Sequence, residues 1–211
     1  MRRAWLLLAA LAGCGGTGAF GLTADDNNPA SLAQAFARER KPTPGKAQNA
    51  TGKPMAFLVV AGQPRKLMAW DLAAGKAAWT VDADVTSRVV VSSGLIAHKE
   101  GRDAVVARDP ADGRKLWSVS LGAKTTFLGL AADGDQVFYV VQDDSGRRTW
   151  YLVAVRGGSE AWRADAPGTL GAPAARGGLV YMPFMTQWLT IIDAQTGKQI
   201  ARVLNKDEAI N

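Results

Sequence analysis

The sequence has a single cysteine and a single histidine among its 211 residues. With Cys14 alone, no disulfide can form within the chain, and no zinc-ligand cluster is present. A hydrolytic triad would have to use His98, and neither a Gly-x-Ser-x-Gly motif nor a P-loop accompanies it. His98 ends a short apolar run before Lys99-Glu100-Gly101. We expect it to be a surface residue beside a turn rather than a catalytic base.

Clustered charge is also scarce. The net charge is +6, but basic residues gather only at Arg38–Lys41 and Arg147-Arg148. A nucleic-acid site needs a basic patch with exposed aromatic residues, so no nucleic-acid partner is expected. Acidic residues gather only around 133–135 and 143–144, without the ordered ligand spacing of a calcium loop. Asp-Gly and Asp-Ser-Gly in that stretch are typical of hairpin turns, so no metal is expected there.

The first residues have the pattern of an export signal. Arg2 and Arg3 precede an apolar stretch that is too short to span a bilayer. It ends in Leu11-Ala12-Gly13-Cys14, which resembles the lipobox of bacterial lipoproteins. The resemblance implies that residues 1–13 are removed and that Cys14 is diacylated and then N-acylated. Gly15 in place of Asp implies an outer-membrane anchor facing the periplasm. The alternative is an ordinary signal peptide with a chance cysteine.

Residues 14–53 contain few large apolar side chains and are rich in Gly, Ala, Pro and Asn. This composition predicts a lipidated N-terminus followed by a flexible tether. Within it, Ser31–Arg40 has Leu32 and Phe36 at helical spacing. One interpretation is a small helix that docks on a partner. The other, a transient turn in the linker, is favoured because a helix of about ten residues is marginal alone.

A repeated stretch organises the rest of the chain. Each copy has an apolar run, a turn that usually runs Asp-x-x-x-Gly, and a second run that ends in Trp. The shared positions are Asp71, Asp109 and Asp193; Gly75, Gly113, Gly158 and Gly197; and Trp79, Trp117 and Trp162. In the third copy Arg156 replaces Asp and the turn is shorter, and in the fourth Ala201 replaces Trp. β-branched runs separated by Asp/Gly turns predict β-hairpins.

The copies recur about every 40 residues, which is the period of a four-stranded propeller blade. Another strand pair fits into each spacer, and residues 54–204 have no helical period. The sequence therefore predicts an all-β fold of about four antiparallel blades, as a partial or small ring, followed by a tail at 205–211. The first blade is expected to lack its innermost strand. The Asp/Gly turns are expected to connect outer strands of successive blades.

The apolar strand followed by Asp-x-x-x-Gly-Lys/Arg-x-x-Trp resembles the PQQ-type β-propeller repeat. The resemblance implies that Trp79, Trp117 and Trp162 pack between adjacent blades. Two classes share this repeat. Quinoprotein alcohol and glucose dehydrogenases bind pyrroloquinoline quinone and calcium in the central channel, whereas outer-membrane assembly lipoproteins of the BamB family are non-enzymatic scaffolds. A lipobox together with these repeats is similar to the second class.

We therefore interpret the chain as a non-catalytic, lipid-anchored periplasmic scaffold without pyrroloquinoline quinone or calcium. The resemblance implies envelope proteins as partners, among them a β-barrel assembly complex and unfolded outer-membrane proteins. Self-association that completes a ring is a further possibility. Two alternatives stay open: a quinoprotein dehydrogenase or a fragment of one, and another envelope lipoprotein that uses its propeller for protein binding.

Overall fold

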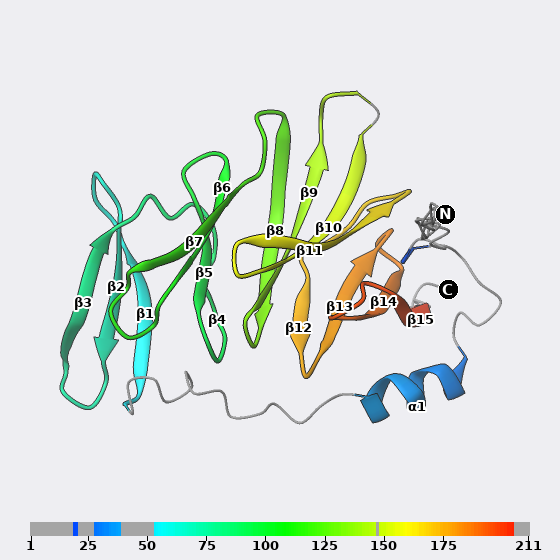
Figure 1. Cartoon of the computed structure of the whole chain (residues 1–211), viewed down its shortest axis with the longest axis horizontal. Helices are drawn as coiled ribbons and strands as arrows, with labels where there is room; N and C mark the ends of the chain where they lie inside the picture. The colour runs from blue at the N-terminus through cyan, green and yellow to red at the C-terminus, as the bar shows by residue number, and fades with distance from the viewer. Residues whose placement is uncertain (1–18, 21–27, 39–52, 147, 205–211) are drawn as a thin grey trace, which may run out of the picture.

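In the computed structural model, the described residues are 19–20, 28–38, 53–146 and 148–204. They form one helix, α1 (Pro29–Arg38), and four antiparallel sheets. The sheets follow one another along an arc, from β1–β3 at one end to β12–β15 at the other (Figure 1). Strand order within each sheet follows chain order, as in the blades of a propeller.

The first blade has three described strands, β1 (Met55–Val60), β2 (Lys66–Asp71) and β3 (Lys76–Asp82). The second has β4 (Val90–Val91), β5 (Ile96–Glu100), β6 (Ala104–Arg108) and β7 (Lys115–Ser120). The third has β8 (Thr125–Asp133), β9 (Gln136–Asp143), β10 (Thr149–Arg156) and β11 (Ser159–Ala166). The fourth has β12 (Ala174–Arg176), β13 (Leu179–Phe184), β14 (Trp188–Asp193) and β15 (Gln199–Leu204).

The expected all-β arc of four blades is confirmed, and no helix occurs in 53–146 or 148–204. The first blade has no described strand at the place that β4, β8 and β12 take in the others, as expected. One detail differs. The Asp/Gly turns join the two outermost strands of one blade, such as β2 to β3 and β6 to β7, rather than strands of successive blades.

The hydrophobic core lies between the blades because central strands are covered on both faces. In β9, Phe138 and Val140 pack in one cluster with residues of the fourth blade. Val137 and Tyr139 point the opposite way and pack in another cluster with residues of the second blade. Alternate side chains of a strand point to opposite faces, so a continuous apolar run marks a strand buried on both sides.

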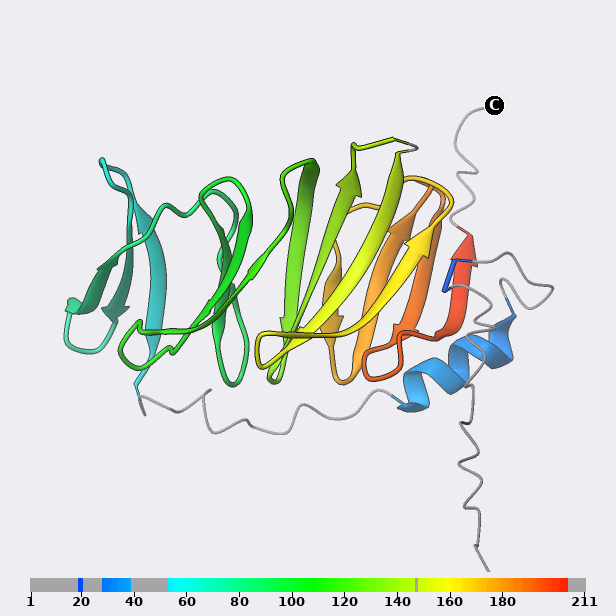
Figure 2. The ribbon, with the colours of Figure 1, turned by 45° about the horizontal axis from the view of Figure 1, so that its top comes forward.

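Two parts of the expected tether pack against the fold instead. Phe20 is 1% exposed, and its ring centroid lies 5.2 Å from that of Phe184 in β13. Helix α1 lies beside β15 at the end of the arc (Figure 2), where Leu32 packs on the buried Ile191 and Ala201. The favoured interpretation of a transient turn at 31–40 therefore differs from the structure. Burial of the apolar side of α1 against the sheet provides stability that a short helix lacks alone.

Candidate functional site

The repeated Asp/Gly turns have a common geometry. The backbone N–H groups of Gly75, Gly113 and Gly197 each donate to the carbonyl of the Asp four residues earlier, at 2.9 Å. The φ angles of these glycines are 63°, 76° and 69°. Other residues adopt such positive φ values only at a cost, which is why glycine recurs there. The shorter third turn uses Gly157 and Gly158, with φ of 57° and 84°.

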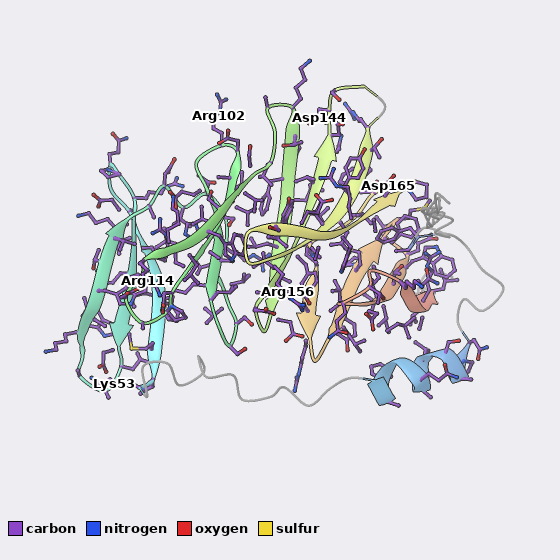
Figure 3. The ribbon with its side chains drawn as sticks, in the orientation of Figure 1. Lys53, Arg102, Arg114, Asp144, Arg156 and Asp165 are labelled. Carbon is purple, nitrogen blue, oxygen red and sulfur yellow. The ribbon has the colours of Figure 1, made fainter. Side chains whose placement is uncertain are left out.

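The aspartates of these turns accept hydrogen bonds from the turn backbone. Asp71 Oδ1 accepts from the N–H groups of Ala73 and Ala74, at 3.0 and 2.8 Å. The bond from Ala74, together with Lys53 Nζ at 3.3 Å from Oδ2, lowers the pKa of Asp71. Lys53 lies at the base of β1 (Figure 3). Asp109 and Asp193 accept from the backbone in the same way.

Each repeat Trp covers the glycine of the following blade. A Cβ atom added to Gly113 would lie 2.7 Å from the Trp79 ring, and one added to Gly197 would lie 2.8 Å from the Trp162 ring. At Gly158 the nearest atom is Trp117 Cβ, at 2.9 Å. These distances are too short for a side chain. Glycine therefore both forms the turn and leaves room for the indole, and the repeat Trp residues bring adjacent blades together.

Two of these indoles also donate a hydrogen bond across the blade interface. Trp79 Nε1 donates to the carbonyl of Pro110 at 3.0 Å, and Trp162 Nε1 donates to the carbonyl of Ala194 at 2.9 Å. Both acceptors lie three residues before the covered glycine. Glycine and carbonyl together form a receptor for an indole, which we call the Trp receptor.

The two ends of the arc differ in this respect. In the fourth blade, Ala201 stands at the Trp position, is 3% exposed and packs with Leu32 of α1. In the first blade, a Cβ atom on Gly75 would meet no atom of the described residues within 4 Å. The helix thus covers the last blade where a Trp would cover a next blade, while the first blade has an open Trp receptor.

A groove of about 660 Å³ runs along the inner strands β4, β8 and β12. At Gly129 of β8 an added Cβ would lie 2.8 Å from Ala172 Cβ, so the inner segments approach closely there. Arg88 is the only charged side chain among the described residues that line the groove, and the lining contains no Asp, Glu, His or Cys.

This lining does not fit the quinone and calcium of the dehydrogenase class. Calcium takes carboxylate and carbonyl oxygens, and a dehydrogenase site needs a base within hydrogen-bond reach of the substrate. The groove offers neither a carboxylate nor another side-chain base. In the described part of the chain, no three His, Cys, Asp or Glu residues are grouped to hold a metal ion. We therefore assign no reaction step to a cofactor.

The expected placement of His98 on the surface is wrong. His98 lies within β5 and is fully buried, at 0% exposure. Arg108 Nε donates to its Nε2 at 3.2 Å, so Nδ1 carries the proton and faces the Lys99 carbonyl at 3.3 Å. Glu100 accepts from Arg108 at 2.7 Å and from Lys115 at 3.2 Å. The short run around His98 gave no signal that both faces of β5 would be covered.

Burial lowers the pKa of His98, and the nearby positive charge of Arg108 adds to this effect. Partial burial raises the pKa of Glu100, but its hydrogen bonds to Arg108 and Lys115 outweigh that and lower the pKa overall. The histidine is thus held neutral as an acceptor. It is enclosed between blades with no nucleophile among its hydrogen-bond partners, so its role is structural.

The predicted lipidation site, Cys14, lies outside the described residues. No helix in the described ranges has the length and apolarity needed to cross a membrane.

Comparison with known proteins gives a family and a fold. A family model described as "Outer membrane protein assembly factor BamB" matches residues 65–207. The chain is similar to the crystal structure of BamB from Moraxella catarrhalis, with a TM-score of 0.50 and 18% identity over 70% of this chain and 49% of that one. It is also similar to a europium-containing methanol dehydrogenase, with a TM-score of 0.55 and 13% identity over 70% of this chain and 39% of that one.

No curated protein sequence matches the chain. The chain spans about half the length of the Moraxella protein and less of the dehydrogenase. At these identities both likenesses show a common propeller fold.

Proposed function

Because the chain belongs to the family of the outer membrane protein assembly factor BamB, we propose that it is a non-catalytic periplasmic scaffold that assists the assembly of β-barrel outer-membrane proteins. The observation that carries this proposal is the chemistry of the central groove. Its single charged lining residue, Arg88, is neither an acid nor a general base at neutral pH. The indoles that could form a stacking platform are occupied between blades.

We also propose that the scaffold is anchored to the outer membrane through lipidated Cys14. Phe20 is buried in the fold and lies six residues after Cys14. Six residues span at most about 20 Å when fully extended, because each adds no more than about 3.6 Å. A lipid on Cys14 would therefore hold the fourth blade close to the membrane. The body would not range as far as a tether of residues 14–53 would allow.

The alternative, a quinoprotein dehydrogenase, is supported by the structural likeness to a methanol dehydrogenase. The two functions are separated by titrating the purified full chain with pyrroloquinoline quinone and calcium. Binding is followed by Trp fluorescence and turnover by dye-linked alcohol oxidation. A scaffold shows neither saturable quinone binding nor turnover. Saturable binding with turnover would replace the scaffold assignment by the dehydrogenase.

A further inference from the structure

The open Trp receptor on the first blade has the same parts as the filled ones. In the second and fourth blades the receptor is a glycine of positive φ and the carbonyl three residues before it, and a Trp from the preceding blade fills both parts. In the first blade the corresponding residues are Gly75, with φ of 63°, and Leu72. Leu72 is 58% exposed, and nothing in the described residues lies within 4 Å of a Cβ atom on Gly75.

The sheet face beside this receptor is apolar and only partly covered. Leu58 of β1 pairs with Met68 of β2, so the two side chains share one face. Leu58 is 45% exposed and Met68 is half-buried. The residues of the second and fourth blades that lie at the same distance before the turn glycine as Met68 and Trp70, which are Val106 and Ile192, are fully buried. The difference arises because a neighbouring blade covers those two faces.

We propose that this end of the first blade is a docking surface for a different protein that presents an exposed Trp on a β-strand. The indole would cover Gly75 and donate its N–H to the Leu72 carbonyl, and the rest of the strand would cover Leu58, Met68 and Trp70. Three blade interfaces in this chain show that such a face takes a Trp-bearing strand. The proposal rests on the proposed function for its setting, since it names the surface by which a scaffold holds a partner.

A second copy of this chain does not fit the receptor. Its repeat residues Trp79, Trp117 and Trp162 are already docked on the following blades. At its last blade the same position is Ala201, which is buried next to helix α1. The described part of a second copy therefore has no repeat Trp to offer, and the occupant is a different polypeptide.

The surface is tested with the full-length chain and a synthetic peptide of residues 105–121, which carries Trp117 on its native strand. Amide shifts of the ¹⁵N-labelled chain are followed during titration. We expect saturable shifts at Leu72 and Gly75. The same peptide with Trp117→Ala should bind at least about tenfold more weakly, because a buried indole contact with its hydrogen bond is lost. This comparison does not depend on the folding of any variant chain.

A variant of the receptor provides the second arm. Gly75→Asn keeps a residue that tolerates positive φ but places a side chain over the receptor. The matched control is Gly101→Asn, because Gly101 also has a φ of 60° and open space around it. We expect Gly75→Asn to weaken peptide binding at least about tenfold and Gly101→Asn to leave it unchanged, given the worth of an aromatic contact.

The inference is overturned if no saturable shift occurs, or if the Trp117→Ala peptide binds as well as the original. Equal binding by Gly75→Asn would also overturn it. Concentration-dependent dimerisation that is lost in Gly75→Asn would show that a second copy is the occupant instead. If peptide binding fails while loss of the protein still impairs outer-membrane assembly, the docking surface is wrong and the proposed function stands.

Discussion

Truncating Trp162 should destabilise the interface between the third and fourth blades. The indole is half-buried, lies 5.9 Å from the Phe138 ring, covers Gly197 and donates to the Ala194 carbonyl at 2.9 Å. Truncation of a fully buried aromatic residue costs about 3–5 kcal/mol. For this partly exposed ring we expect Trp162→Ala to lower the free energy of unfolding by about 2–4 kcal/mol, combining lost area with one lost hydrogen bond.

The matched variant is Trp162→Phe, which keeps an aromatic ring over Gly197 and removes the indole N–H. It should lose about 1–2 kcal/mol, from one hydrogen bond and a smaller ring. Urea unfolding followed by far-ultraviolet circular dichroism is the suitable assay, because it does not depend on the fluorescence of the mutated residue. A loss below about 1 kcal/mol for Trp162→Ala would refute inter-blade packing by this Trp.

Four further outcomes are expected. Phe20→Ala should cost about 3–5 kcal/mol in urea unfolding, because a fully buried ring is removed; a loss near zero would mean that the segment is not docked. Ala201→Trp should destabilise the chain by about 1–3 kcal/mol through overpacking against α1, and a thermal melt at or above that of the natural chain would contradict the capped end. His98 has a pKa lowered from 6.5, so the unfolded chain takes up a proton first and stability should fall as the pH drops below 6.5. Since the sequence has no other histidine, urea midpoints should lose this dependence in His98→Gln, and unchanged pH dependence would rule out His98 as its source. Cys14→Ser should move the protein from the membrane pellet to the soluble fraction or stall its processing, and normal processing with unchanged membrane fractionation would exclude the anchor.

The blades could be predicted because their signal is local and repeated. A strand, an Asp/Gly turn and a second strand recur at nearly constant spacing, and Gly113 and Gly197 are fixed by backbone conformation as well as by contact with Trp. The same logic indicated the missing inner strand of the first blade, since the apolar run of β1 precedes the repeat with no other strand before it. The family resemblance supplied the place of the Trp residues between blades.

The features that escaped prediction depend on contacts between distant segments. Phe20 and Leu32 lie in stretches too short and too polar to signal packing, yet both meet the fourth blade more than 140 residues later. His98 looked like a turn residue because Lys99 and Glu100 follow it, whereas Arg108 on the adjacent strand β6 encloses it. The open receptor at Gly75 shows only when its three filled counterparts are compared in space.

The central claim is that this chain assists outer-membrane protein assembly without catalysis. It is tested most directly by measuring the amount of folded β-barrel protein in the outer-membrane fraction after the gene is deleted from the bacterium that carries it, with the natural gene restored as control. The account predicts that folded β-barrel protein falls and recovers on restoration. Unchanged β-barrel levels, with loss of a quinone-dependent alcohol oxidation, would contradict it.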